Sequence, residues 1–232
     1  MSAFDDLNLP DTDLARSATR LARDTESPAV FHHSVRTYLY GRLHGERQGL
    51  RPGHDYDDEL LYLGCVLHDI GLTDEGDRDQ TFDVDGADLA AEFLSGLGLA
   101  DDRVEVVWDA IALHVVSHVA RRKRPEIALV SAGAGIDLGP LGPDGPPLPE
   151  EFVARVHTAF PRLHGAAVLF DTIVDQALAK PHKAPPFSFP GELVRQRTGE
   201  RWPTWRELMT AEPTWNDYDG YGTSARADLA GD

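Results

Sequence analysis

The sequence predicts an all-α protein, and three observations support this fold class. Apolar residues recur at helical spacing through most of the chain, no alternating strand pattern extends beyond a few residues, and helix-starting residues precede most apolar segments. The 232 residues are 41% hydrophobic, which is enough for a sizeable core in a single domain. We therefore expect one compact bundle of about eight helices.

Four of these helices are expected in the first part of the chain. Each follows a residue that commonly caps or starts a helix, and each carries apolar residues on one face. The expected segments are one capped by Asp11 or Thr12, one from Ala29 to about Arg47, one that begins after Asp55 or Asp57 and stops at Gly71, and one from Asp85 to about Gly96. The charged stretch 72–80 is expected to be a solvated loop.

Four further helices are expected in the second part. The expected segments are one capped by Asp101-Asp102 that runs through Val115, one from Pro125 to about Asp137, a short one after Pro149, and one from Gly165 to Lys180. On the first of them His114 and His118 would share one face, because they are four residues apart. Gly133 and Gly135 inside the second indicate close approach of another helix, and the Pro- and Gly-rich stretch 139–149 is expected to be a loop.

The chain is expected to divide into three parts. Residues 1–28 would form an N-terminal helix and lead-in, residues 29–186 the helical domain, and residues 187–232 an irregular C-terminal extension rich in Pro and aromatic residues. We expect the aromatic residues of this extension to pack on the core or against a partner subunit. They are Phe187, Phe189, Trp202, Trp205 and Trp215.

Composition excludes several classes of protein. The chain carries 22 basic and 39 acidic side chains, a formal charge of −17, so nucleic acid is not an expected partner. Cys65 is the single cysteine, which excludes an internal disulfide and favours a reducing cytoplasm. No apolar run is long enough to span a membrane, and the acidic N-terminus does not resemble a signal peptide. We expect a cytoplasmic protein, possibly a homo-oligomer, that acts on a small molecule.

Metal-type ligands stand at helix positions that otherwise belong to the core. They are His33, the dyad His68-Asp69, and Asp137. The dyad ends an apolar helix, where a carboxylate is costly to bury unless a partner such as a cation compensates it. Two His and two Asp suit one divalent transition metal, Zn²⁺ first and Fe²⁺ or Mn²⁺ next. With a position left for water, such a metal can supply hydroxide near neutral pH.

Five matches in order carry a resemblance to a known family. The matching segments are His33-Ser34-Val35-Arg36, Leu67-His68-Asp69-Ile70-Gly71-Leu72-Thr73-Asp74, Phe82 to Gly86, Ile111-Ala112-Leu113-His114, and Gly133-Ala134-Gly135-Ile136-Asp137. From roughly Ala29 to Pro186 the chain resembles the HD-domain metal-dependent hydrolase superfamily, and more narrowly its cyanamide-hydratase-like branch. The resemblance implies an all-α HD-type bundle.

The resemblance also implies roles for individual residues. His33, His68, Asp69 and Asp137 would hold the metal, and His114 would line the pocket. The branch commonly has Asn where this chain has His32, so a substrate contact there would differ, which puts cyanamide itself in doubt as the substrate. Members of the wider superfamily are mostly phosphohydrolases of nucleotides.

A few members are di-iron oxygenases, and they need two further histidines from separate helices. After the dyad, the candidates for these in the core are His114 and His118, which are expected on one helix. We therefore favour a mononuclear site over a dinuclear one.

Several further residues are candidates for the site. His114 or Asp74 would move protons, although Asp74 could equally be a loop cap. Arg36, one turn after His33, would bind an anionic substrate group or pair with a carboxylate. His118, His32 and Phe82 complete the candidate substrate contacts.

The predicted function is that of a mononuclear metal-dependent hydrolase or hydratase that adds water to a small polarised substrate, such as a nitrile-like compound. A phosphoester pocket should hold several Lys or Arg side chains, whereas this chain has no lysine before Lys123. Three alternatives remain: an HD-type phosphohydrolase of a nucleotide or other phosphoester, a di-iron HD oxygenase, and a non-catalytic metal-stabilised module.

Overall fold

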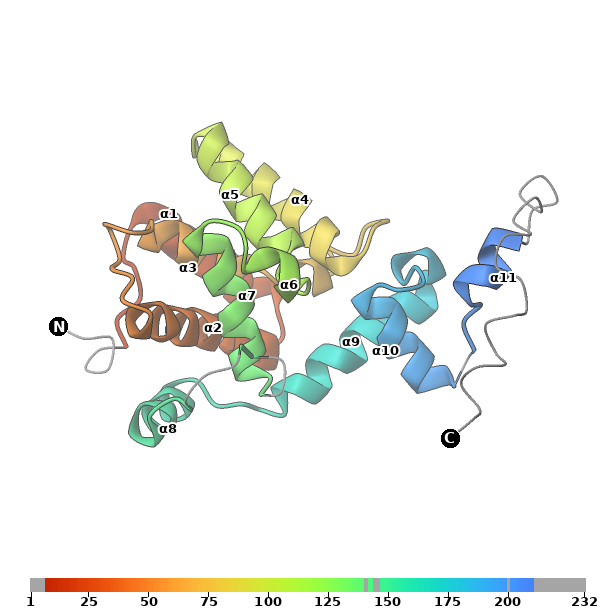
Figure 1. Ribbon diagram of the computed structural model, residues 1–232. Coiled ribbons are helices and arrows are strands. Elements are labelled where there is room, and N and C mark those ends of the chain that lie inside the picture. Colours follow the sequence, from red (N-terminus) through yellow and green to blue (C-terminus); the bar gives the residue numbers. More distant parts are fainter. Residues whose placement is uncertain (1–6, 140–141, 144–146, 200, 211–232) are drawn as a thin grey trace. The chain divides into compact units, whose positions relative to one another are not determined.

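The computed structural model describes residues 7–139, 142–143, 147–199 and 201–210. Within these ranges it contains eleven α-helices, two short 3₁₀ helices and no β-strand, so the predicted all-α class is confirmed and the expected number of helices was too low (Figure 1). None of the helices in these ranges has the length and apolar character needed to span a membrane.

The helices follow one another with short connections. Their bounds are α1 Asp13–Thr25, α2 Pro28–Arg47, α3 Asp58–Leu67, α4 Phe82–Gly96, α5 Asp101–Ala112, α6 Ser117–Ala120, α7 Pro125–Asp137, α8 Glu150–Ala159, α9 Gly165–Ala179, α10 Phe189–Thr198 and α11 Trp205–Thr210. The two 3₁₀ helices are η1 Ile70–Leu72 and η2 Pro181–Lys183.

Polar side chains at the starts of the first three helices satisfy free backbone N–H groups. Thr12 accepts a hydrogen bond from the N–H of Ala15, and Ser27 accepts one from the N–H of Val30. Asp57 accepts hydrogen bonds from two N–H groups in the first turn of α3. Thr12 and Asp57 are therefore the caps, rather than their alternatives Asp11 and Asp55.

The region after α5 differs from the prediction. α5 ends at Ala112, and His118 lies on the separate helix α6, so His114 and His118 do not share a helix. The chain turns because Ser131 of α7 donates a hydrogen bond to the carbonyl oxygen of His114, and the His114 side chain binds the carbonyl oxygen of Ile111. These contacts involve a distant helix, and the local apolar spacing does not reveal them.

Other boundaries also need correction. Asp101 and Asp102 lie in the first turn of α5 and do not cap it, because Ala100 occupies the N-cap position. α4 begins at Phe82 instead of Asp85. The C-terminal extension is not irregular throughout, because α10 and α11 lie in it.

Close packing of α2 against α7 positions the site. An added Cβ on Gly41 would lie 2.6 Å from the carbonyl oxygen of Leu129, and one on Gly133 would collide with the carbonyl oxygen of Thr37. The backbones of the two antiparallel helices therefore touch here, as the glycines predicted. One turn beyond the contact of Thr37 with Gly133, His33 of α2 meets Asp137 of α7.

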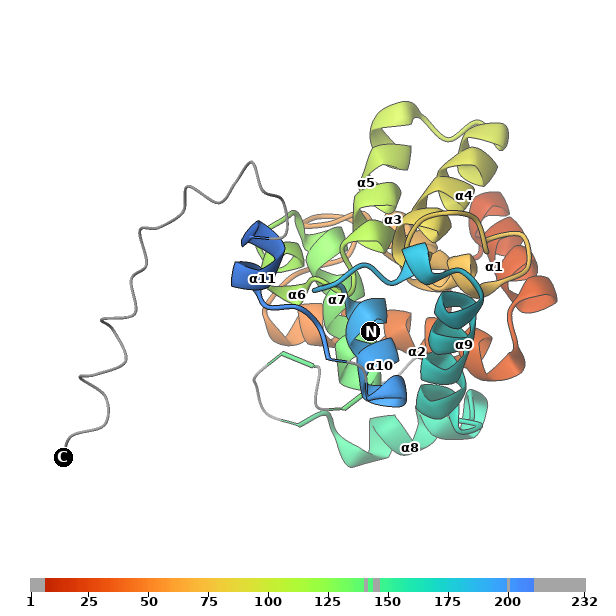
Figure 2. The same cartoon turned by 90° about the vertical axis from the view of Figure 1, so that its right-hand side faces the viewer.

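The chain separates into two compact units, one up to Val194 and the other from Arg195. In the first unit α9 and the start of α10 lie side by side, with the Phe170 and Phe189 rings 6.1 Å apart (Figure 2). Phe189 thus packs on the core. The second unit contains the end of α10 and α11, and Trp215 lies outside the described residues. The predicted domain boundaries at 28 and 186 remain predictions.

Candidate metal centre

Four buried side chains from three parts of the bundle meet at one point. His33 comes from the middle of α2, His68 and Asp69 follow α3, and His114 follows α5. The Nε2 atoms of His33 and His68 are 3.2 Å apart, and the His68 Nε2 lies 3.2 Å from Oδ2 of Asp69. The His33 Nε2 lies 3.7 Å from the same oxygen, and the His114 Nε2 lies 3.9 Å from Oδ1 of Asp69.

A glycine fixes the backbone just after this dyad. An added Cβ on Gly71 would collide with the carbonyl oxygen of Phe82 at the start of α4. Only glycine lets α4 approach the 3₁₀ turn so closely, and this approach holds His68 and Asp69 under the helix. The requirement at Gly71 is therefore one of space.

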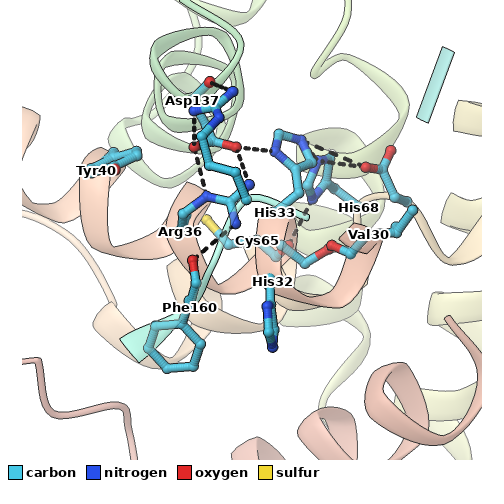
Figure 3. A network of polar contacts seen from close by, with 12 residues as sticks. Val30, His32, His33, Arg36, Tyr40, Cys65, His68, Asp137 and Phe160 are labelled. Atoms are coloured by element: carbon cyan, nitrogen blue, oxygen red, sulfur yellow. Dashed lines mark hydrogen bonds and ion pairs between the residues drawn. The ribbon is translucent and has the colours of Figure 1, made fainter. Parts of the chain in front are cut away.

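The three imidazoles share a hydrogen-bonding arrangement. The Nδ1 of His68 lies 2.7 Å from the carbonyl oxygen of Cys65, and the Nδ1 of His114 lies 2.6 Å from that of Ile111. A carbonyl oxygen only accepts, so each Nδ1 carries the hydrogen and the neutral ring keeps its lone pair on Nε2. In His33 the Nδ1 lies 2.7 Å from Oδ2 of Asp137, which imposes the same tautomer (Figure 3). Metal-binding histidines commonly show this pattern.

Asp69 provides the clearest sign that a cation belongs here. Its carboxylate is 1% exposed, and neither oxygen has a hydrogen-bond partner. A buried carboxylate facing imidazole lone pairs is unfavourable unless a positive charge lies between them. His33, His68 and Asp69 each offer a ligand atom within 4.8 Å of the others, and this mixed nitrogen and oxygen set suits a divalent transition metal. The residues present therefore fit such a metal.

His114 stands beside this group as a further nitrogen donor. Burial, and then the neighbouring His68, lower the pKa of His114 to about 4. The ring is therefore neutral near pH 7, with its Nε2 lone pair available to a metal or to a proton.

Asp137 is not brought into the cluster. Its Oδ2 accepts from His33 and from Nη2 of Arg36, both at 2.7 Å, and its Oδ1 accepts from Nε of Arg36 at 2.8 Å. Arg162 adds an ion pair at 3.3 Å. Burial would raise the pKa of this carboxyl, but the hydrogen bonds from Arg36 and His33 outweigh burial and hold the pKa below its ordinary value. Ligation by Asp137 stays a prediction, because the carboxylate contacts the opposite nitrogen of His33.

Arg36 takes the second of its two expected roles. Its side chain is fully buried, and it also donates to the carbonyl oxygens of Phe160 and Pro161, both at 3.1 Å. Figure 3 shows its guanidinium beside Asp137. Arg36 therefore pairs with a carboxylate in this structure, and it does not line the cavity above the cluster.

A small cavity of about 130 Å³ opens onto the cluster. Besides the four metal-centre side chains, its walls are mostly apolar, and none of its described lining residues is Lys or Arg. The apolar lining side chains are Phe82, Val115, Ala134, Leu138, Leu169, Ile173 and Phe189. Phe82, expected as a substrate contact, also stacks edge-on against His114 at 5.6 Å.

Three other expected site residues lie elsewhere. Asp74 is exposed in the turn after η1, and His118 is exposed on α6. His32 points away from the cluster and lies 3.0 Å from the carbonyl oxygen of Pro161. Sequence reasoning missed Leu169, Ile173 and Phe189 as cavity residues. The aromatic character of the extension was the available signal for Phe189.

The helical bundle and its buried centre of His and Asp side chains define the class of protein, an all-α metal-dependent hydrolase fold. The chain belongs to the HD domain family, whose model matches residues 30–153. It is 27% identical over 176 residues to cyanamide hydratase DDI2 and to cyanamide hydratase DDI3, both of Saccharomyces cerevisiae. Each alignment covers 72% of this chain and 73% of the relative. The resemblance found in the sequence is thereby confirmed.

Proposed function

We propose that the chain is a mononuclear metal-dependent hydratase or hydrolase that adds water to a small, neutral, polarised substrate. A nitrile-like compound is the substrate class that we favour. The cavity carries this proposal, because it holds about 130 Å³, directly adjoins the cluster of three His and one Asp, and has no cation among its described lining residues. The printed names of the two yeast relatives support the same class.

Each group in the site has a role in this reaction. His33, His68 and Asp69 would hold the metal. A bound divalent metal would polarise the substrate or lower the pKa of water towards about 7. The Nε2 of His114 would accept the proton that water loses and return it to the substrate nitrogen. The apolar walls would exclude bulk water, which strengthens these polar interactions.

The proton role goes to His114 instead of Asp74. His114 lines the cavity, whereas Asp74 is exposed and does not. In the balanced reaction the water oxygen bonds to the nitrile carbon, and both water protons end on product oxygen or nitrogen. Cyanamide would give urea in this way.

The size and charge of the cavity disfavour the phosphohydrolase alternative. Sites for drug-sized ligands hold about 300–1,000 Å³, and phosphate groups are commonly held by several Arg or Lys side chains. The cavity above the cluster offers neither. The oxygenase alternative loses a ligand, because His118 is exposed and lies outside the cavity.

Elemental analysis and a substrate panel test the proposal. The chain is purified without chelators and assayed with cyanamide, simple nitriles, nucleoside monophosphates and a generic phosphodiester. We expect one metal per chain and water addition to cyanamide or a nitrile. The Asp69→Asn variant should lose this activity, and His118→Ala should keep it.

Other outcomes would contradict the proposal. Phosphate release without any nitrile hydration would favour the phosphohydrolase. About two irons per chain with oxygen uptake would favour the oxygenase. Absence of metal together with unchanged melting of His68→Ala would favour the non-catalytic module.

A further inference from the structure

A second, larger cavity lies on the other side of Asp137. It holds about 680 Å³ and is formed by the end of α2, the end of α7, α8 and the segment before α9. Arg162 lines this cavity and His33 lines the smaller one, and both side chains contact Asp137. The two cavities share no described lining residue.

The larger cavity concentrates positive charge in an acidic protein. Its described lining residues include two arginines and two histidines but no Asp or Glu, whereas the whole chain carries a formal charge of −17. The four basic residues are His44, Arg47, His157 and Arg162. Arg36 and Arg162 also share the single carboxylate of Asp137, so one guanidinium charge is left over among these three groups.

The histidines of the cavity report this positive potential. Burial lowers the pKa of His157, and Arg162 and Arg36 lower it further. Burial and then Arg47 lower the pKa of His44 in the same way. Cations therefore act from both ends of the cavity, and an anion placed there would be stabilised.

We propose that this cavity binds a small molecule that carries a phosphate group. Arg47 and Arg162 would supply guanidinium forks, which match the oxygens of phosphate. The hydroxyl of Tyr40, which lies 3.1 Å from Nε2 of His157, would supply a further donor from the cavity wall. The volume lies within the range of about 300–1,000 Å³ typical of small-molecule sites.

Titration calorimetry of inorganic phosphate into the full-length, metal-loaded chain tests this site. Ionic strength is held constant with chloride, and the buffer contains no phosphate. We expect saturable binding of one phosphate per chain. Arg47→Met should weaken it roughly tenfold, the loss expected for one hydrogen-bonded charged group. Arg122→Met removes the same charge from an exposed site outside the cavity and should leave binding unchanged.

A second variant and a second anion make the test decisive. His157→Gln should also weaken binding, and it keeps the assay informative if Arg47→Met does not fold. Phosphate binding that both variants leave intact would place the anion elsewhere, such as at the metal centre, and would overturn the proposal. It would also be overturned by the absence of saturable binding, by equal weakening in Arg122→Met, or by acetate binding as tightly as phosphate.

Discussion

At the residue scale, two buried carboxylates differ in what surrounds them. Asp137 is satisfied by His33, Arg36 and Arg162, whereas Asp69 has no hydrogen-bond partner on either oxygen. Both are almost fully buried. The protein therefore stabilises one carboxylate with its own side chains and leaves the other to a cation. This contrast assigns ligation to Asp69 and positioning of His33 to Asp137.

The two carboxylates should respond differently to the same substitution. We expect Asp69→Asn to abolish stoichiometric metal binding, and Asp137→Asn to weaken it by about 10–100-fold, as the loss of an outer partner of a ligand does. Metal affinity measured by competition with a chelator checks this, with His118→Ala as a control that should bind normally. Equal losses in both Asn variants would make Asp137 a direct ligand, as the family resemblance implies.

Without metal, Asp69→Asn should not be destabilising. The substitution removes a buried negative charge that lacks a hydrogen-bond partner, so the metal-free variant should unfold at the same urea concentration as the metal-free parent chain, or at a higher one. A clear decrease in the free energy of unfolding would mean that Asp69 has a structural partner. Chemical denaturation in the presence of chelator measures this difference.

Arg36 should contribute strongly to stability. Replacing it with Met leaves Asp137 buried with less compensation, and loss of one partner from a buried ion pair costs about 3–5 kcal/mol. Urea denaturation checks this value. Arg20→Met on α1 removes an exposed arginine and should change the free energy of unfolding by less than about 0.5 kcal/mol. Similar small changes in both variants would contradict this role of Arg36.

Sequence patterns predicted the ligands better than the partners of the ligands. His33 and the His68-Asp69 dyad stand out locally, because polar residues interrupt apolar helices. The pairing of Arg36 with Asp137 joins residues 101 positions apart, and spacing along the chain cannot reveal it. The sequence left two roles open for Arg36, and the tertiary contact decides between them.

At the element scale, the crossing of α2 and α7 determines where His33 lies. The sequence indicated close approach through Gly133, but only the packed structure shows that Gly41 is the other half of the contact. The predicted end of α5 failed for a related reason. Ser131 of α7 binds the carbonyl oxygen of His114, so a tertiary hydrogen bond ends a helix that the apolar pattern would have continued.

Gly133→Ala should therefore be more harmful than an ordinary helix substitution. The added Cβ would collide with the carbonyl oxygen of Thr37, and overpacking of this kind costs about 1–3 kcal/mol. Gly96→Ala in α4 is the matched control, because no atom lies within 4 Å of its added Cβ. The control should gain up to about 1 kcal/mol through helix propensity. Denaturation midpoints compare the two, and equal effects would contradict tight packing at the crossing.

At the scale of the whole molecule, the candidate ligands connect distant parts of the chain. His33, His68-Asp69 and His114 come from separate segments, so they meet only after the bundle has folded. The sequence predicted most helices of this bundle correctly. It did not predict that Phe189, beyond the expected domain end, would line the cavity, because this depends on how α10 packs against α9.

Metal removal should lower the thermal stability of the whole bundle. A metal at about 100 times its Kd stabilises the native state by about 2.7 kcal/mol, which corresponds to roughly 5–10 °C in Tm for a chain of this size. Scanning calorimetry with and without chelator checks this shift, and added Zn²⁺ should restore the original Tm. The chelator should not change the Tm of Asp69→Asn, and an equal shift in that variant would place the stabilising metal elsewhere.

The meeting of His33 with Asp137 also bears on how α2 and α7 find their alignment. Small residues at a crossing permit two helices to slide along each other by a turn with little steric cost. A slip of one turn here would place His33 opposite Gly133, and both Asp137 and Arg36 would lose their partners. The buried polar cluster therefore penalises every neighbouring register and selects the alignment in which the Nε2 of His33 faces Asp69.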